Sequence, residues 1–396
     1  MRYWGNTKYK LKTQMSKLKT TTQNSKLNKY WREWKKTIIL GVGIFILAFF
    51  LRFYNLTSLP IFGDEAIYIR WAQVMGAEPG LRFLPLSDGK QPLFMWVLMF
   101  LVRRFSDPLL IGRLTSVFYG MGTLLGIFLL TYNLFKNKKA ALIASFIYAI
   151  SPYSLFFDRM ALVDCLLAMF GVWTLFLGVV TARTLKLDFA MLTGFALGGA
   201  LLTKSPASFF AILLPTTWLL SSLPKGGRKR INHFVRLILL LLVTYLIAYG
   251  MYNILRLGES FHMLALRNQD YIYSINHAIS SPFDPLIPFL RRSFEWFWLL
   301  GPSVLIVLVL TGIWINLKKF RKETLVLSLW TFLPIIVSAE FAKVFTARYI
   351  TFVVPSFVIL AATAFLGSKY RNIITVVFIF YILHALWIDN FILTDV

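Results

Sequence analysis

The chain has 396 residues, of which 58% are hydrophobic, and its mean hydropathy is +0.67. Because soluble domains are about 45–50% apolar, this composition excludes an ordinary soluble protein and predicts a membrane protein. The formal charge is +25, but the cations form short runs between apolar segments, as topology determinants do, so nucleic-acid binding is not predicted. The one cysteine, Cys165, excludes an intrachain disulfide and a cysteine-based metal site.

The N-terminal segment is strongly basic. Residues 1–36 carry 11 Lys or Arg and one acid, Glu33. They are too polar to pack into a core, so we predict a mobile tail that can lie against anionic lipid head groups. The positive-inside rule places this tail in the cytoplasm. The apolar run 37–53 is then the first membrane span, leading outward.

The first external loop is predicted over residues 54–91. It contains Phe62-Gly63-Asp64-Glu65-Ala66-Ile67-Tyr68, in which two carboxylates are adjacent. On a short helix these acids point about 100° apart, so one can face a cavity while the other holds a neighbour. Alternatively, both are first-turn charges that the helix dipole favours. The loop closes at Asp88-Gly89-Lys90-Gln91-Pro92-Leu93, where Pro92 suits the first turn of a membrane helix.

From residue 136 on, charge and hydropathy alternate regularly. Two apolar segments separate successive cationic clusters, so all five clusters can be cytoplasmic. In residues 92–135 the pattern needs an odd number of crossings, so either the shorter apolar segment dips in or lies obliquely, or one of the cationic clusters is misplaced. We therefore predict an all-α polytopic membrane protein with about 11–13 crossings in one transmembrane domain, 37–396, and a second large external loop, 256–292. The clusters are Lys136–Lys139, Arg183–Lys186, Lys225–Arg230, Lys318–Lys322 and Lys369–Arg371.

Several separate segments bring charge to the external ends of the predicted spans. Ionisable groups in or beside membrane spans are costly and are therefore candidates for a functional site. For Asp164 the alternative is helix–helix hydrogen bonding at a span end, and for Lys204 and Arg348 it is extension of the cation to the membrane interface. His262 and His277 are 15 residues apart without a compact motif, so the sequence does not support a divalent metal or another cofactor. The external charges are Asp64, Glu65, Asp88, Lys90, Asp158, Arg159, Asp164, Lys204, Glu340, Lys343 and Arg348.

Six motifs in order, within residues 37–366, carry a family resemblance. Together they resemble the GT-C membrane glycosyltransferases of the protein O-mannosyltransferase and lipid A aminoarabinose transferase superfamily. Gln91 stands where the Lys-Pro-Pro-Leu motif of that family has its first proline. The motifs are Phe62–Tyr68 with its Asp-Glu pair, Gly89–Leu93, Arg113–Ser116, the stretch from Ser151-Pro152 to Asp164, Gly198–Pro206, and Arg348-Tyr349 before Pro355.

The resemblance implies a GT-C bundle that transfers a sugar from a polyprenyl-phosphate donor to an acceptor outside the cytoplasm. Asp64 is then the general base or acceptor-orienting carboxylate, and Glu65 orients the loop or binds the acceptor. An inverting transfer needs one carboxylate near the acceptor hydroxyl, and its phosphate leaving group needs positive charge. The cations implied for the donor phosphate are Lys204 first, then Lys90, Arg159 and Arg348, with Asp164, Tyr68 and Asp88 in support.

The expected setting is the plasma membrane, with a cytoplasmic N-terminus and an extracytoplasmic active site. The expected partners are the lipid-linked donor, an extracytoplasmic lipid, glycan or protein acceptor, and the bilayer itself. Two other functions stay open: a transporter or flippase of a lipid-linked saccharide, and a non-catalytic membrane subunit with the same fold. A transporter predicts charges near the bilayer midplane and internal repeats, and the sequence shows neither.

Overall fold

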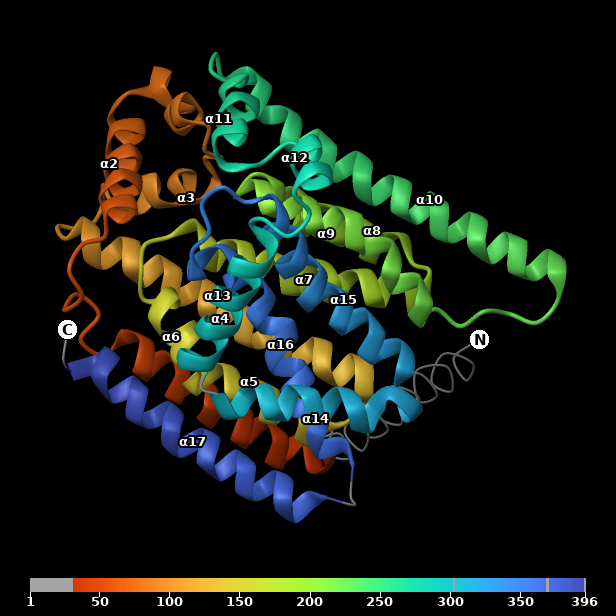
Figure 1. Cartoon of the computed structure of the whole chain (residues 1–396). Helices are drawn as coiled ribbons and strands as arrows, with labels where there is room; N and C mark the ends of the chain where they lie inside the picture. The colour runs from red at the N-terminus through yellow and green to blue at the C-terminus, as the bar shows by residue number, and fades with distance from the viewer. Residues whose placement is uncertain (1–30, 302, 368–369, 395–396) are drawn as a thin grey trace, which may run out of the picture. The chain divides into compact units, whose positions relative to one another are not determined.

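The computed structural model describes residues 31–301, 303–367 and 370–394 (Figure 1). Within these ranges the regular elements are helices, and one isolated antiparallel bridge joins Ile272 to Ala342. The predicted all-α class is therefore confirmed. The N-terminal helix is Trp31–Phe53. The next helices are α2 (Gly63–Ala77), η1 (Pro79–Leu81), η2 (Leu84–Asp88), α3 (Leu93–Leu101), α4 (Pro108–Phe135), α5 (Lys138–Ile150), α6 (Pro152–Asp158), α7 (Val163–Thr184) and α8 (Leu187–Leu201).

The C-terminal half continues in the same way, with short 3-10 turns between longer helices. Its elements are η3 (Ser205–Ala207), α9 (Ser208–Leu213), η4 (Leu214–Leu220), α10 (Gly227–Tyr252), η5 (Asn253–Leu257), α11 (Met263–Tyr271), α12 (Ile275–Ser280), α13 (Leu286–Leu299), α14 (Ser303–Lys319), α15 (Arg321–Phe341), η6 (Ala347–Val353), α16 (Val354–Ala362), η7 (Thr363–Leu366) and α17 (Arg371–Thr394).

The described residues contain seven helices that are long and apolar enough to cross a membrane. Two bent helix pairs, α5 with α6 and α13 with α14, raise this number to nine if each pair is one span. Two shorter apolar helices, Leu187–Leu201 and Ser205–Leu220, bring the total to eleven if they also cross. The structure thus reaches the lower end of the predicted 11–13 only with these short helices.

The segment 92–135, where the charge pattern left the number of crossings open, forms two helices of unequal length. Helix α3 has nine residues and is therefore about 14 Å long, too short to cross a hydrocarbon core of about 30 Å. Helix α4 has 28 residues and begins at a cap, because the Asp107 side chain accepts hydrogen bonds from the amides of Leu109 and Leu110. The length of α3 fits a segment that dips in or lies obliquely, and how it meets the bilayer stays a prediction.

Small residues let the central helices pack closely. A Cβ at Gly126 of α4 would lie 2.7 Å from Val172 Cγ1 on α7, and one at Gly120 would lie 2.5 Å from Asp158 Oδ2. In a membrane, where burial of apolar surface adds little, such close approach of helices favours their association. Glycines at these two positions therefore allow α4 to pack against α7 and the end of α6.

The predicted tail falls mostly outside the described residues, since only 31–36 are described and they begin the first helix. The chain divides within that helix into two units, 1–44 and 45–396. The division into a cytoplasmic tail and one transmembrane domain stays a prediction. The two loops that are predicted to be external are largely helical: 54–91 holds α2, η1 and η2, and 256–292 holds α11, α12 and the start of α13.

Candidate active site

Helix α2 sends its two adjacent acids into different surroundings. Glu65, at the third helical position, accepts a hydrogen bond from the backbone N–H of Phe62 at the helix start, as in a capping box. Its side chain is fully buried, whereas the Asp64 side chain is 18% exposed. The two carboxylates therefore diverge, as the helical spacing predicts.

Glu65 is held by protein groups on both carboxylate oxygens. Arg113 Nε donates to Oε1 and Nη2 donates to Oε2, each at 2.9 Å, and the backbone N–H of Ala161 donates to Oε1 at 2.7 Å. Arg113 also donates to the backbone carbonyls of Leu56 and Leu59 at 3.0 and 2.9 Å. This buried bidentate pair fixes the start of the first loop and keeps Glu65 away from the cations around Asp64.

Asp64 lies between two cations from distant parts of the chain. Its Oδ2 is in ion-pair contact with Arg348 Nη1, and its Oδ1 lies 3.8 Å from Lys90 Nζ. Arg348 Nη1 is buried, so its positive charge acts directly on the Asp64 carboxylate. The guanidinium lies 5.3 Å from the ring centre of Phe62 and 5.2 Å from that of Tyr349.

A second ion pair also lies against the ring of Tyr349. Lys204 Nζ donates to Asp164 Oδ1 at 2.5 Å and lies 4.6 Å from the Tyr349 ring centre. Because Lys204 and Arg348 both border this ring, their charges are at most about 10 Å apart. Asp164 Oδ2 is buried without a hydrogen-bond partner. We call Asp64, Lys90, Asp164, Lys204, Arg348 and Tyr349 the Asp64 cluster.

Lys90 is shared between two carboxylates. Its Nζ lies 3.2 Å from Asp88 Oδ2 and 3.8 Å from Asp64 Oδ1. The rings of Tyr68 and Trp71 flank it at 5.4 and 5.5 Å. Burial, followed by the nearby charges of Asp64 and Asp164, raises the pKa of Tyr68 well above its ordinary value, so its hydroxyl stays neutral.

Asp88 lies beside the Asp64 cluster, in contact with Lys90. Partial burial acts to raise its pKa, but the hydrogen bonds from Arg267 and Lys90 outweigh burial, so the pKa lies below its ordinary value. Asp88 is therefore ionised at neutral pH. It joins the first loop to α11 of the second loop through Arg267.

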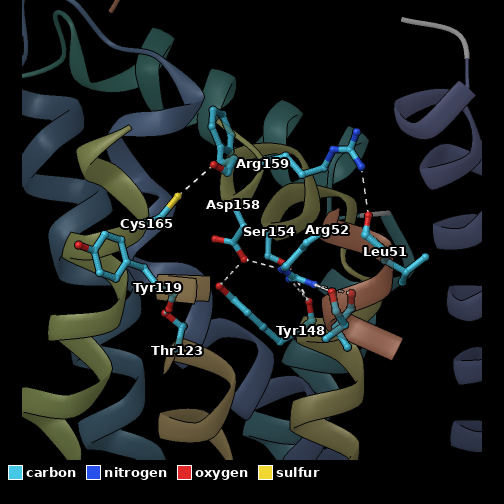
Figure 2. A network of polar contacts seen from close by, with 12 residues as sticks. Leu51, Arg52, Tyr119, Thr123, Tyr148, Ser154, Asp158, Arg159 and Cys165 are labelled. Atoms are coloured by element: carbon cyan, nitrogen blue, oxygen red, sulfur yellow. Dashed lines mark hydrogen bonds and ion pairs between the residues drawn. The ribbon is translucent and has the colours of Figure 1, made fainter. Parts of the chain in front are cut away.

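Arg159 is the one predicted phosphate-binding cation that the structure places elsewhere. Its Nη1 donates to the carbonyls of Leu51 and Tyr54 at 3.1 and 2.6 Å, and its Nη2 donates to that of Asn55 at 2.8 Å. Burial, with Arg113 and Arg52 nearby, lowers its pKa to about 10. Figure 2 shows the guanidinium turned toward Leu51. Arg159 thus holds the end of the first helix.

A buried network beside Arg159 was missed from the sequence (Figure 2). Arg52 Nε and the Tyr148 hydroxyl both donate to Asp158 Oδ2 at 2.9 Å. Arg52 Nη1 and Nη2 donate to the carbonyls of Ala149 and Tyr148 at 3.0 and 3.2 Å. The network ties the first helix to α5 and α6. The signal in the sequence was Arg52, near the end of an apolar run, where an arginine usually extends to the membrane interface.

Neither a metal-ligand group nor a pocket adds residues to this cluster. Among the residues that the structure describes, no three His, Cys, Asp or Glu side chains are placed to hold a metal ion. A small cavity between α7, α8, η4 and α10 is lined by apolar side chains and by Thr181, Thr193, Thr217 and Thr244. Thr181 is 17 residues along α7 from Asp164, which is about 25 Å, so this cavity is separate from the Asp64 cluster.

The sequence matches one family model. The model described as dolichyl-phosphate-mannose-protein mannosyltransferase matches residues 89–249. This range contains Lys90, Asp164 and Lys204 but neither Asp64 nor Arg348. No curated protein matches the chain.

Solved structures match over most of the chain. ArnT from Cupriavidus metallidurans in the apo state has a TM-score of 0.57 and 15% identity, covering 85% of this chain and 60% of that one. The same protein bound to undecaprenyl phosphate has a TM-score of 0.56 and 17% identity, covering 84% and 61%. Archaeal oligosaccharyltransferase AglB from Archaeoglobus fulgidus, in complex with an inhibitory peptide and a dolichol-phosphate, has a TM-score of 0.56 and 14% identity, covering 91% and 56%.

The chain spans less than two thirds of the length of each of these proteins, and at such identities the likeness is one of fold. The helices and the likeness together describe an integral membrane protein. In fold, and in the sequence of residues 89–249, the chain resembles the GT-C glycosyltransferases of the protein O-mannosyltransferase and lipid A aminoarabinose transferase superfamily, which confirms the resemblance predicted from its motifs.

Proposed function

We propose that this protein is a membrane glycosyltransferase that moves a sugar from a polyprenyl-phosphate donor to an acceptor on the extracytoplasmic side. The observation that carries the proposal is one partly exposed carboxylate, Asp64, in ion-pair contact with Arg348 and 3.8 Å from Lys90, with Lys204 against the ring of Tyr349 that Arg348 also borders. The GT-C fold supports it. The ArnT and AglB structures were solved with undecaprenyl phosphate and a dolichol-phosphate, which supports the class of donor.

The proposed chemistry needs one proton transfer and one substitution. Asp64 accepts the proton of the acceptor hydroxyl while the acceptor oxygen attacks the anomeric carbon of the donor sugar. The bond from that carbon to the phosphate oxygen breaks, and the polyprenyl phosphate leaves with the bonding electrons. Attack opposite the leaving group inverts the anomeric centre. The cations stabilise the negative charge that develops on the phosphate.

The ion pairs give a reason for the donor to bind before the acceptor. Arg348 neutralises Asp64 through an ion pair whose two side chains are partly exposed. A donor phosphate that takes this guanidinium leaves Asp64 free to receive the acceptor. Lys204 is held by Asp164, which leaves its other N–H groups for a phosphate oxygen. We propose Asp64 as base, Lys204, Lys90 and Arg348 as phosphate-binding cations, and Asp164, Tyr68 and Asp88 as their supports.

Glu65 and Arg159 are outside the proposed reacting set, because protein groups occupy both side chains. The orientation is proposed from the cationic clusters: a cytoplasmic N-terminus, with the Asp64 cluster facing outward from the plasma membrane. The acceptor is proposed to be a hydroxyl of a lipid, glycan or protein in the cell envelope.

The test is sugar transfer by purified protein in lipid nanodiscs, with a panel of polyprenyl-phosphate sugars and extracted envelope acceptors. Transfer with at least one donor is expected, and Asp64→Asn should reduce its rate about 100-fold or more. Glu259→Gln, a change at an exposed acid of the second loop, is the matched control. Undiminished transfer by Asp64→Asn would contradict the role of Asp64. Movement of intact donor across the bilayer without bond cleavage would favour the flippase.

A further inference from the structure

Helix α11 of the second external loop rests directly on the first loop. Gly89 adopts a left-handed conformation with φ at 65°, and a Cβ there would lie 2.5 Å from Arg267 Cβ and 2.9 Å from the carbonyl oxygen of Met263. Leu264 of α11 is buried in a cluster with Leu86. Glycine is therefore needed at position 89 both for its backbone angle and for the approach of α11.

The other end of α11 is fastened to the segment that leads to Arg348. The backbone N–H of Lys343 donates to the carbonyl of Tyr271 at 2.8 Å, and that of Tyr273 donates to the carbonyl of Phe341 at 2.7 Å. Lys343 Nζ also donates to the carbonyl of Gln269 at 2.7 Å. Helix α11 is thus fixed at both ends beside the Asp64 cluster.

Arg267 on this helix binds one carboxylate oxygen of Asp88, and Lys90 lies beside the other. Its Nη2 donates to Asp88 Oδ1 at 2.6 Å, while Asp88 Oδ2 lies 3.2 Å from Lys90 Nζ. Arg267 Nη1 donates to Asp270 at 3.0 Å. Each carboxylate oxygen of Asp88 therefore has its own cation, and Lys90 stays within 3.8 Å of Asp64.

We propose that Arg267 is a positioning residue of the donor site: by occupying one oxygen of Asp88, it keeps Lys90 shared with Asp64 and available to the donor phosphate. This inference rests on the function proposed above. Without Arg267, the whole charge of Asp88 acts on Lys90 and draws it away from Asp64. A donor phosphate must then displace a stronger ion pair, so donor affinity falls, while Asp64 keeps its ion pair with Arg348.

The effect should be moderate and sensitive to salt. The side chains of Arg267, Asp88 and Lys90 are 39%, 32% and 27% exposed, so solvent screens their interactions. We expect the dissociation constant for a polyprenyl phosphate to rise about threefold to fivefold in Arg267→Gln at low salt. In 1 M NaCl, where the screening length is about 3 Å, the difference from the wild type should vanish.

The experiment measures binding of farnesyl phosphate to the full chain in nanodiscs. Arg267→Gln keeps the carbon stem that packs on Gly89, and Arg267→Lys should restore binding. In an Asp88→Asn background, Arg267→Gln should cause no further loss, because the charge through which it acts is gone. Asp270→Asn removes only the other partner of Arg267 and should bind as the wild type does.

Each other outcome has a distinct meaning. Unchanged binding by Arg267→Gln, an equal loss in the Asp88→Asn background, or a loss that persists in 1 M NaCl would each overturn the role of Arg267. If the wild type itself fails to bind farnesyl phosphate, the proposed function is overturned and the role of Arg267 falls with it. Sugar-transfer kinetics give a second test of this role. Arg267→Gln should raise KM for the donor and leave kcat within about twofold of the wild-type value.

Discussion

Asp64 and Glu65 are neighbours in the sequence, yet they belong to two different kinds of charged region. Glu65 and Arg113 are both fully buried, and seven hydrogen bonds join them to each other and to backbone groups of Phe62, Ala161, Leu56, Leu59 and Pro60. Asp64 and its cations Arg348 and Lys90 meet instead in ion pairs that are partly exposed. The first region is closed and the second can accept new partners.

The difference shows how the same residue types serve two purposes. A buried pair whose hydrogen bonds are all made specifies one geometry, because losing any partner leaves an uncompensated group. A partly exposed cluster that retains an unpartnered carboxylate oxygen, at Asp164, can exchange partners at lower cost. We therefore propose the chemistry for the second region. The first holds the backbone that carries it.

The largest effect expected is on stability, at the closed pair. Glu65→Ala leaves Arg113 buried without a counter-charge and should destabilise the protein by about 3–5 kcal/mol. Thermal unfolding in detergent, followed by tryptophan fluorescence, would measure the loss. The double variant Glu65→Leu with Arg113→Leu should recover much of it, because no unpaired charge remains. A stable Glu65→Ala protein would contradict the closed character of this pair.

At the neighbouring residue, Asp64, we expect the opposite pattern: a small change in stability and a large loss of activity. Asp64→Asn should change stability by less than about 1 kcal/mol, because its ion pairs are partly exposed. Its sugar transfer should nevertheless fall about 100-fold or more. Measuring both quantities on one preparation separates the two regions. If Asp64→Asn unfolds as easily as Glu65→Ala, the distinction between the two acids is wrong.

A smaller loss is expected at Lys204. Lys204→Met removes one phosphate-binding cation and should lower kcat/KM about tenfold to 100-fold, less than a fully buried donor would because the side chain is 21% exposed. Lys204→Arg keeps the charge and should retain most of the activity. Lys186→Met, at a cationic cluster predicted to be cytoplasmic, is the control. Equal losses at Lys186 and Lys204 would indicate a nonspecific effect of charge.

Much of the fold follows from sequence pattern alone. The all-α class, the helix after Gly63 and the divergence of Asp64 from Glu65 all follow from hydropathy and helical geometry. The short α3 agrees with the charge pattern of residues 92–135. The number of crossings was harder to predict, because Leu187–Leu201 and Ser205–Leu220 are shorter than a straight crossing needs.

The direction of long side chains could not be read from the sequence. Arg159 and Arg348 both lie near the external ends of predicted spans, but Arg159 turns to the carbonyls of residues 51, 54 and 55. That choice depends on where the end of the first helix packs, which is a tertiary contact. Arg52 was missed for the same reason, because its partner Asp158 lies 106 residues away.

The smallest effect is expected at Asp88, beside the Asp64 cluster. Asp88 has a pKa below its ordinary value of 3.8, so its stabilising contribution is fully present above pH 3.8 and is lost as the pH falls through the lowered folded-state pKa. At pH 6 the free energy of unfolding of the wild type should exceed that of Asp88→Asn by less than about 1 kcal/mol, because the ion pairs of Asp88 with Arg267 and Lys90 are partly exposed. Thermal unfolding at low salt should show this difference shrinking toward zero below pH 3.8, since acid then neutralises Asp88 as the substitution does. A difference that grows on acidification would mean that the carboxylate is held neutral, and the sharing of Lys90 between Asp88 and Asp64 would have to be abandoned.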